Sequence, residues 1–263
     1  MKKKWKRILR ALPLRGKVAL LGGFAFFVFL IGFFAFKILQ PETPGRIYIQ
    51  KQTQLKPENM AEALQERKKK ELQTMMDSGA IDVIAAFDDY ALFGDSRAYG
   101  LKSYGVLDPD FVYAEAGHTI LNCTDYKDVI QQTRPARLVF SYGVNDMGLE
   151  IGGDGDHAYA QTFEQKIDEL LAVVPDAKVF VCSIIDVTPS AKERSPRWDK
   201  AARYNAQLQE MCQRRGWIYV DNDPLGNDLS SYQEDGVHFT PDFTWTWARN
   251  IAKTMWETVF ASE

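Results

Sequence analysis

Short apolar runs alternate with amphipathic stretches along the chain from about Ile81 to its end. The apolar runs have the length of strands and cover residues 90–93, 111–114, 137–142, 178–184 and 217–220. Longer stretches with helical periodicity cover residues 126–132, 159–173, 198–214 and 243–260. Strands and helices in this alternation are typical of a parallel sheet with helices on both faces. We therefore predict an α/β fold, a three-layer α/β/α sandwich around a five-stranded, mainly parallel sheet.

A continuous apolar segment near the N-terminus departs from this alternation. Residues 18–36 contain no charged or polar side chain, and a helix extended to Leu39 can span the roughly 30 Å hydrocarbon core of a bilayer. Eight Lys and Arg residues precede the segment, whereas three follow it over a similar distance. By the positive-inside rule, the sequence predicts one transmembrane helix with the N-terminus in the cytoplasm and the chain after Leu39 outside.

A cleaved signal peptide is the competing interpretation of this segment. The apolar region of a signal peptide usually has about 7–15 residues and ends at small residues of the A-x-A type. Here the apolar segment runs instead into the sequence FKILQPETPG. This favours an uncleaved signal anchor and a location in the cell membrane, with the bulk of the chain extracytoplasmic.

The predicted parts of the chain follow from these patterns. Residues 1–17 form a basic cytoplasmic N-terminus, residues 18–39 the anchor, residues 40–80 an extracytoplasmic linker, and residues 81–263 a folded domain. Within the linker, residues 56–77 predict a mostly polar helix with sparse apolar positions, as expected of a stalk.

Charge and cysteine content exclude some classes of function. The 263 residues carry a formal net charge of −3, which provides no basic field for a nucleic-acid partner. The three cysteines, Cys123, Cys182 and Cys212, form no C-x-x-C pair. This argues against a disulfide framework or a zinc site, and no other metal site is required by the sequence.

Chemically active side chains follow the predicted strands at their carboxyl ends, where parallel sheets bind ligands. The segments are GDSR at residues 94–97, EAGHT at 115–119, GVNDMG at 143–148 and EDGVHFTP at 234–241. Together they place a Ser, a Gly, an Asn and an Asp/His pair at one edge of the sheet. Asp146 is interpreted as a residue that caps the turn or forms a hydrogen bond to it.

Ser96 needs a base to act as a nucleophile, and histidine suits that task near neutral pH. The chain has three histidines. His157 lies in a Gly/Asp-rich loop, and His118 beside Gly117 is a candidate substrate contact. His238 follows Asp235 by three residues, so the carboxylate can accept a hydrogen bond from one ring nitrogen while the other faces Ser96.

These residues resemble the SGNH hydrolase superfamily of GDSL-like esterases, over residues 86–260. The resemblance implies a flavodoxin-like fold in which Ser96 is the nucleophile and His238 and Asp235 are the base and acid of a catalytic triad. It implies an oxyanion hole formed by Ser96, Gly117 and Asn145, no cofactor and no metal. Residues 204–205 also resemble a family segment.

The segment FGDSRAYG at residues 93–100 is interpreted as a strand-to-helix turn that lifts Ser96 into a crevice, with glycines that allow close backbone approach. The competing interpretation makes Ser96 a helix N-cap. Arg97, which replaces the Leu of the family name, is either a contact to an anionic substrate group or part of a surface ion pair.

Resemblance and predicted topology together imply a membrane-tethered serine esterase or O-acyltransferase that works through an acyl-enzyme. The expected substrates are short acyl esters, acetyl above all, of cell-envelope glycans, and a transferase would add a membrane acyl-donor partner. One alternative is a lipid or lysophospholipid esterase. Another, from a different class, is a non-catalytic envelope scaffold or glycan-binding protein.

Overall fold

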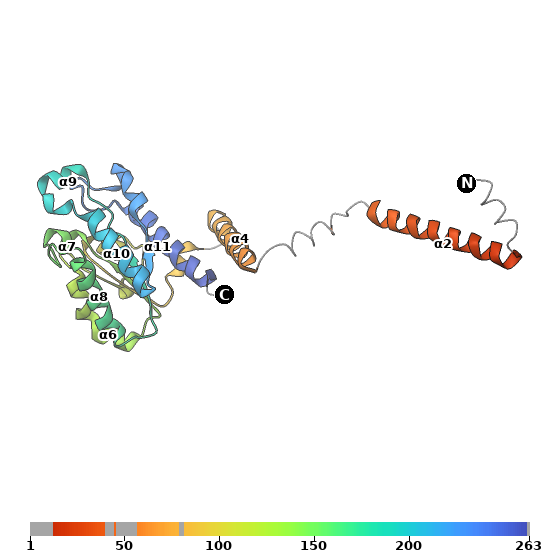
Figure 1. Cartoon of the computed structure of the whole chain (residues 1–263). Coiled ribbons are helices and arrows are strands. Elements are labelled where there is room, and N and C mark those ends of the chain that lie inside the picture. The colour runs from red at the N-terminus through yellow and green to blue at the C-terminus, as the bar shows by residue number, and fades with distance from the viewer. Residues whose placement is uncertain (1–12, 40–44, 46–56, 79–81, 262–263) are drawn as a thin grey trace. The chain divides into compact units, whose positions relative to one another are not determined.

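The structure of the protein is a computed structural model that describes residues 13–39, 45, 57–78 and 82–261. The chain divides by its internal contacts into two units, Met1–Leu64 and Gln65–Glu263, and Figure 1 labels most of the α-helices that the structure describes. The described residues of the N-terminal part of the chain include the helices α2 (Leu14–Leu39) and α4 (Pro57–Asp77). The second of these covers nearly all of the predicted stalk helix.

The predicted anchor remains a prediction. Among the side chains that the structure describes, no helix offers a stretch both long enough and apolar enough to cross a membrane. Most of the predicted basic N-terminus and part of the predicted linker lie outside the described residues.

The second unit is built around a five-stranded sheet whose neighbouring strands all pair in parallel. The strands are β1 (Tyr90–Gly94), β2 (Val112–Ala114), β3 (Arg137–Ser141), β4 (Lys178–Cys182) and β5 (Ile218–Val220). Their order is β2-β1-β3-β4-β5, so the chain changes direction across the sheet between β1 and β3. The α/β fold and the five strands predicted from the sequence are confirmed, and the change of direction marks the edge where a ligand site is expected.

Helices follow the strands in this unit. The α-helices are α5 (Ser96–Ser103), α6 (Lys127–Thr133), α7 (Val144–Gly148), α8 (Ala158–Leu171), α9 (Pro189–Arg194), α10 (Ala201–Arg215) and α11 (Pro241–Ala261). Short 3₁₀ turns lie at η1 (Val83–Ala86), η2 (Pro109–Phe111), η3 (Ile120–Tyr126), η4 (Pro196–Trp198), η5 (Asp223–Asn227) and η6 (Leu229–Ser231). The four predicted helices correspond to α6, α8, α10 and α11. Residues 188–200 contain α9, because Pro189 and the capping side chain of Thr188 start a helix there.

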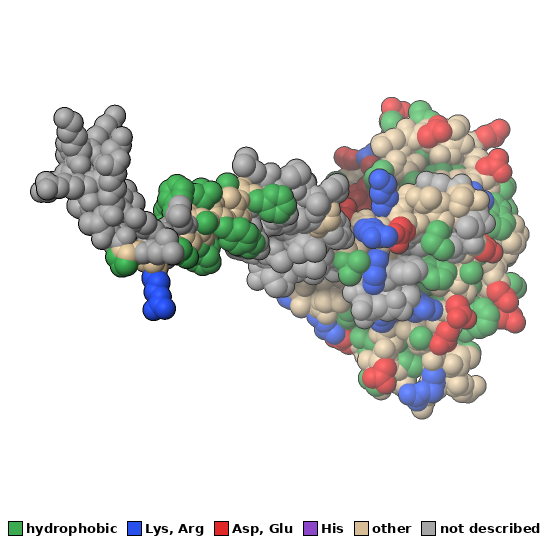
Figure 2. Space-filling model, turned by 90° about the vertical axis from the view of Figure 1, so that its right-hand side faces the viewer, with side chains coloured by type: hydrophobic (Ala, Val, Ile, Leu, Met, Phe, Trp, Pro, Cys, Tyr) green, Lys and Arg blue, Asp and Glu red, His purple; other side chains and the backbone are tan. Residues whose placement is uncertain are grey.

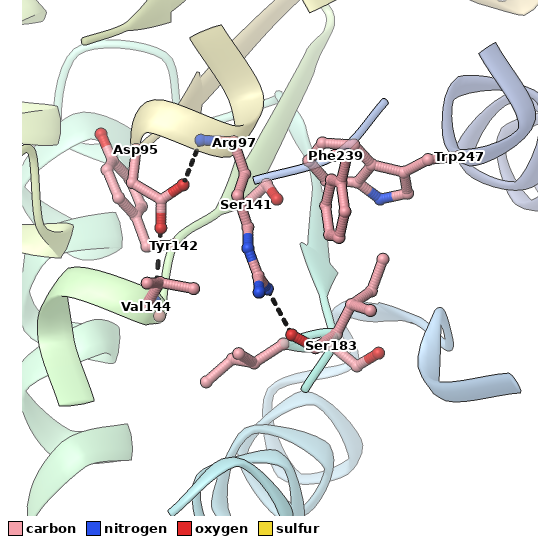
Figure 3. A pocket seen from close by; sticks show the side chains of 11 residues that line it. Asp95, Arg97, Ser141, Tyr142, Val144, Ser183, Phe239 and Trp247 are labelled. Atoms are coloured by element: carbon pink, nitrogen blue, oxygen red, sulfur yellow. Dashed lines mark hydrogen bonds between the residues drawn. The ribbon is translucent and has the colours of Figure 1, made fainter. Parts of the chain in front are cut away.

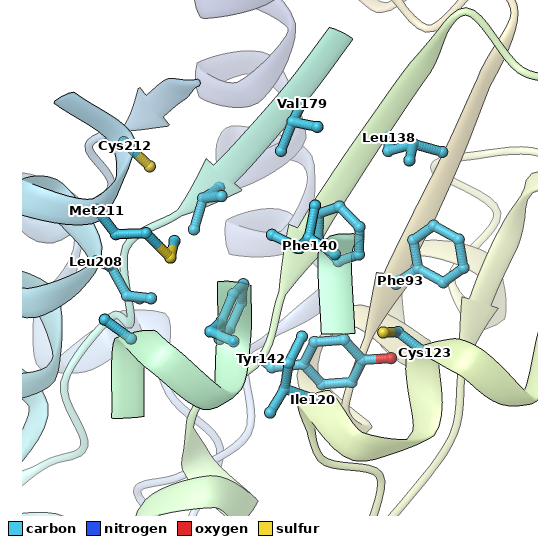
Figure 4. Close-up of a cluster of buried hydrophobic side chains, with 14 of the residues drawn as sticks. Phe93, Ile120, Cys123, Leu138, Phe140, Tyr142, Val179, Leu208, Met211 and Cys212 are labelled. Atoms are coloured by element: carbon cyan, nitrogen blue, oxygen red, sulfur yellow. The ribbon is translucent and has the colours of Figure 1, made fainter. Parts of the chain in front are cut away.

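Two apolar clusters fill the space on the two faces of the sheet. Leu92 and Val139 belong to one cluster, whereas Phe93 and Phe140 belong to the other, because successive strand residues point to opposite faces. Figure 4 shows Phe93 and Phe140 on the same side as Leu208 of α10. All three cysteines are buried and free.

Acidic and basic side chains are interspersed on the face of the second unit that Figure 2 shows. Neither the acidic nor the basic side chains form a separate patch there. The surface in this view therefore matches the small net charge of −3.

Candidate active site

Ser96 is the first residue of α5, directly after the tight turn that follows β1, and the predicted strand-to-helix turn is confirmed. A Cβ on Gly94 would lie 2.2 Å from the Cβ of Ala98 and 2.7 Å from the carbonyl oxygen of Ser141, so only glycine permits this close approach. The N-cap of α5 is Asp95, whose Oδ1 accepts a hydrogen bond from Arg97 N at 2.9 Å. The N-cap interpretation of Ser96 is therefore wrong, and its hydroxyl is left for another partner.

That partner is His238. The Nε2 atom of His238 lies 2.9 Å from Ser96 Oγ, and its Nδ1 atom lies 2.5 Å from Asp235 Oδ2. The other carboxylate oxygen of Asp235 accepts from the backbone N–H groups of Val237 at 2.8 Å and His238 at 2.9 Å. Burial alone would raise the pKa of Asp235, but the ring of His238 and these N–H groups together lower it to about 2. The carboxylate is thus charged and fixed against the imidazole.

The remaining predicted residues reach the same edge of the sheet from two loops. Asn145 is the second residue of α7, and its Nδ2 donates to the carbonyl oxygen of His118 at 2.9 Å. Gly117, which precedes His118, has a φ of +83°, a conformation that favours glycine. The first N–H groups of a helix lack intrahelical acceptors, and Ser96 opens α5. This arrangement leaves the second amide hydrogen of Asn145 and the N–H of Ser96 available to an oxyanion.

Replacing Asn145 with Ala should lower kcat about 10²–10³-fold and leave KM nearly unchanged, because an oxyanion donor acts mainly in the transition state. Initial rates over a range of ester concentrations measure both constants. Asn250→Ala is a matched control, since this amide also donates to a carbonyl oxygen, that of Asp221 at 2.8 Å, but on α11. An effect of Asn145→Ala confined to KM would exclude the oxyanion role.

Asp146 does not cap α7, whose N-cap is Gly143; its carboxylate instead reaches a neighbouring loop. Its Oδ1 accepts from the backbone N–H of Ile120 at 3.0 Å, so α7 holds the Gly117 loop through two adjacent residues. The carboxyl group is fully buried, and its Oδ2 has no partner among the described residues. Burial raises the pKa of Asp146 to about 8.

Asp146 should therefore make stability fall as pH rises. An unfolded Asp loses its proton near pH 4, whereas the folded protein retains it up to about pH 8, so the contribution is lost between these values. Asp146→Asn should flatten this dependence, and its stability relative to the wild type should be greater at pH 8 than at pH 5 by at least about 1 kcal/mol. Urea unfolding at both pH values measures the difference, and parallel curves would show that Asp146 is ionised in the folded state.

The two candidate substrate contacts, His118 and Arg97, lie in different surroundings. The His118 ring packs near Tyr126 at 6.2 Å between centroids, and its Nδ1 is buried without a partner in the described structure. Arg97 is not part of a surface ion pair, because only 6% of it is exposed. Its guanidinium binds backbone carbonyl oxygens. His157, in contrast, lies outside the site, with Nδ1 3.6 Å from Glu210.

A pocket of about 320 Å³ opens beside Ser96 and His238. Tyr99 and Tyr104 line it and are 40% and 38% exposed. Gln233 also lines it and donates from Nε2 to the hydroxyl of Tyr104 at 2.8 Å. The sequence reasoning missed all three residues. The sequence could have indicated Tyr99, because it follows Ser96 by three residues and therefore lies on the same face of α5.

The described residues contain no group of three or more His, Cys, Asp or Glu side chains that could hold a metal ion.

Comparison with known proteins gives a family and a fold. A sequence profile of the GDSL-like Lipase/Acylhydrolase family matches residues 92–243, and a search of curated proteins finds no match. Solved structures similar to this chain include an acetyl esterase mutant with an acetate ion, at 17% identity and a TM-score of 0.50, covering 66% of this chain and 99% of that one.

Two further structures are an acetyl xylan esterase from Geobacillus stearothermophilus and the lipase/acylhydrolase from Enterococcus faecalis. The first has 16% identity and a TM-score of 0.47, covering 63% of this chain and 93% of that one. The second has 15% identity and a TM-score of 0.46, covering 62% and 92%. At such identities the likeness is one of fold. The family profile, however, spans more than half of the chain and includes every residue from Ser96 to His238, and the protein therefore belongs to the GDSL-like lipase/acylhydrolase family, the SGNH esterases.

Proposed function

We propose that the protein is a serine esterase or O-acyltransferase that acts through an acyl-enzyme on short acyl esters of cell-envelope glycans. The observation that carries the proposal is the continuous chain of hydrogen bonds from Asp235 through His238 to Ser96 at the mouth of a pocket. Such a chain is the arrangement that activates a serine hydroxyl.

In the first half of the reaction Ser96 Oγ attacks the ester carbonyl, and its proton moves to Nε2 of His238. Asp235 holds the imidazole in the required tautomer and stabilises the cation that forms. The negative charge on the carbonyl oxygen is met by the N–H of Ser96, the N–H of Gly117 and the amide of Asn145. Collapse of the intermediate breaks the ester bond, and the leaving alcohol takes the proton from His238.

In the second half, water or a hydroxyl group of an acceptor attacks the acyl-enzyme with His238 as its base. The bond between the acyl group and Ser96 Oγ then breaks, and His238 returns the proton to Oγ. Water gives an esterase, whereas a sugar hydroxyl gives an O-acyltransferase. A transferase would also use an acyl donor, for which a membrane partner is the proposed source.

The pocket supports a sugar as the alcohol part of the substrate. Because the leaving oxygen receives its proton from His238, the alcohol must lie on the His238 side of Ser96. The pocket on that side combines the exposed rings of Tyr99 and Tyr104 with the exposed polar side chain of Gln233. Ring faces can pack against the C–H groups of a sugar while the polar groups bind its hydroxyls.

The acyl part is proposed to be acetyl. An acetyl esterase shares the fold with this chain, and the same short acyl group is what we propose for its substrate. A lipid ester would place a long apolar chain at the site. Comparing the hydrolysis of acetyl and octanoyl esters distinguishes this alternative from an acetyl esterase.

The location is proposed from the sequence. The uncharged residues 18–36, with eight basic residues before them, support a single transmembrane helix and an extracytoplasmic esterase domain near its envelope substrates. Protease treatment of intact and permeabilised cells tests this. Digestion of the domain only after permeabilisation of the cytoplasmic membrane would contradict the proposed orientation.

The first test of function is hydrolysis of chromogenic acetyl, butyryl and octanoyl esters by the full chain in detergent. We expect the highest kcat/KM on acetyl, and release of acetate from an acetylated glycan. Preference for octanoyl would favour the lipid esterase. Absence of activity on all three esters and on the glycan, with no acyl transfer to added sugar, would contradict an enzymatic role and favour the scaffold.

A further inference from the structure

Arg97 directly follows the candidate nucleophile, yet its side chain is turned away from solvent. Only 6% of the residue is exposed. Figure 3 shows the side chain extending from α5 across the carboxyl ends of the strands toward Ser183, the residue after β4. The guanidinium therefore lies beneath the active site and not at its mouth.

The guanidinium binds both loops that face α5. Its Nε donates to the carbonyl oxygen of Val237 at 2.8 Å, one terminal nitrogen donates to that of Ile185, and the other to that of Asp186 at 3.4 Å. The central carbon lies 4.5 Å from the centre of the Phe239 ring, within cation–π range. Because Val237 and Phe239 flank His238, Arg97 holds the candidate base from both sides.

The loop after β4 is itself firmly held, so it can serve as an anchor. Asn205 of α10 accepts from the N–H of Ile184 at 2.8 Å and donates to its carbonyl oxygen at 3.0 Å. The hydroxyl of Tyr232 donates to the carbonyl oxygen of Asp186 at 2.8 Å. Arg97 thus connects the helix that carries Ser96 to a fixed loop and to the His238 loop at once.

The positive charge of Arg97 contributes little to the stability of the fold, so stability does not explain why the side chain is buried. Burial lowers its pKa, with Asp95 acting in the opposite direction, and a buried cation is a weak source of stability. Its hydrogen-bond acceptors are neutral carbonyl oxygens. A planar group with five N–H donors is, however, well suited to fixing several acceptors in one geometry.

We propose that Arg97 is a positioning residue that sets the distance between Ser96 Oγ and His238 Nε2, which is 2.9 Å in the structure. It does so by fixing the backbone on both sides of His238 relative to the first turn of α5. The inference rests on the proposed function, in which these two atoms exchange a proton. Small errors in such a distance have large kinetic effects, about 10²-fold for 1 Å.

The kinetic test compares Arg97→Met and Arg97→Lys with the wild type, all as full chains in detergent. Met keeps an unbranched apolar stem and removes every donor, so kcat on the acetyl ester should fall about 10–100-fold while KM changes less than about threefold. The rate of inactivation by a fluorophosphonate should fall in parallel with kcat, because this reagent reacts once with Ser96 and its rate does not depend on deacylation. Lys keeps the charge and can reach one carbonyl oxygen, so it should recover part of the loss.

Leu208→Ala serves as the matched control for stability. Leu208 is fully buried in α10, in the apolar cluster on the opposite face of the sheet from Phe239. The variant should lose about 2–5 kcal/mol of unfolding free energy. It should nevertheless keep wild-type kcat below its thermal transition. If Arg97→Met also keeps wild-type kcat, the positioning role is wrong.

Amide hydrogen exchange gives a readout that does not depend on activity. The N–H groups of Val237 and His238 are bonded to Asp235, so their exchange is slow enough to follow. In Arg97→Met it should accelerate at least about tenfold while exchange in β1 stays unchanged. If the wild type cleaves no ester, the proposed function fails, but this exchange still decides on the positioning role. Unchanged exchange at both residues would overturn it.

Discussion

Replacing Ser96 with Ala should abolish ester cleavage, with a fall in kcat of at least about 10⁴-fold, because nothing else at the site can form the acyl-enzyme. The thermal transition should stay within a few degrees of the wild type. Asp95 is the cap of α5, and the Ser96 hydroxyl has His238 as its hydrogen-bond partner, so the substitution removes neither a cap nor core packing. Ester hydrolysis and a thermal melt on the same preparation measure both quantities.

Ser190→Ala is the matched control for this substitution. The Ser190 hydroxyl is also hydrogen-bonded to a side chain, that of Thr188 at 3.0 Å, but lies in α9. The Ser190→Ala substitution should leave kcat unchanged. Full activity in Ser96→Ala would remove Ser96 as the nucleophile, and a large loss of stability would mean that its main role is structural.

Replacing Asp235 with Asn should lower kcat about 10⁴-fold, the size of effect measured for the corresponding substitution in another serine hydrolase. The Asn oxygen can still accept from the N–H groups of Val237 and His238, but its amide would then face Nδ1 of the imidazole. An amide donates where the carboxylate accepted, so Nδ1 would lose its proton and Nε2 would carry it. The ring would then donate to Ser96 and could not take its proton.

Asp228→Asn is the control for this change. Its carboxylate accepts from Ser230 N at 2.9 Å, and Asn caps such a turn as well as Asp does. Its kcat should equal that of the wild type. A loss of less than about tenfold in Asp235→Asn would show that the carboxylate is not needed to set the tautomer, since the tautomer effect is far larger. Nitrogen NMR of the His238 ring in both proteins would show directly which atom carries the proton.

The strands were predictable because their signal is local. Each observed strand lies within its predicted apolar run or extends it by one residue, since a strand buried on both faces is apolar throughout. The short helices α7 and α9 were not predicted. A helix of five or six residues is too short to show an apolar stripe, and it exists because neighbouring segments hold it.

The meeting of the site motifs at one edge of the sheet was also predictable, for a topological reason. In a parallel sheet all carboxyl ends lie at one edge, so residues that follow different strands meet there. Ser96 and His238 are 142 positions apart, yet the sequence predicted their pairing. Their catalytic roles await the substitutions described above.

The sequence by itself determined the apolar N-terminal segment, the alternation of strands and helices, and the edge at which Ser, Asn, Asp and His gather. These depend on local composition and on the rules of strand connection. The tertiary structure alone decided that Arg97 turns inward to the carbonyl oxygens of Ile185 and Val237, 88 and 140 positions away. It likewise decided that Asp146 holds Ile120. The partners in these contacts are backbone atoms, which every residue carries, so no side-chain pattern in the sequence can reveal them.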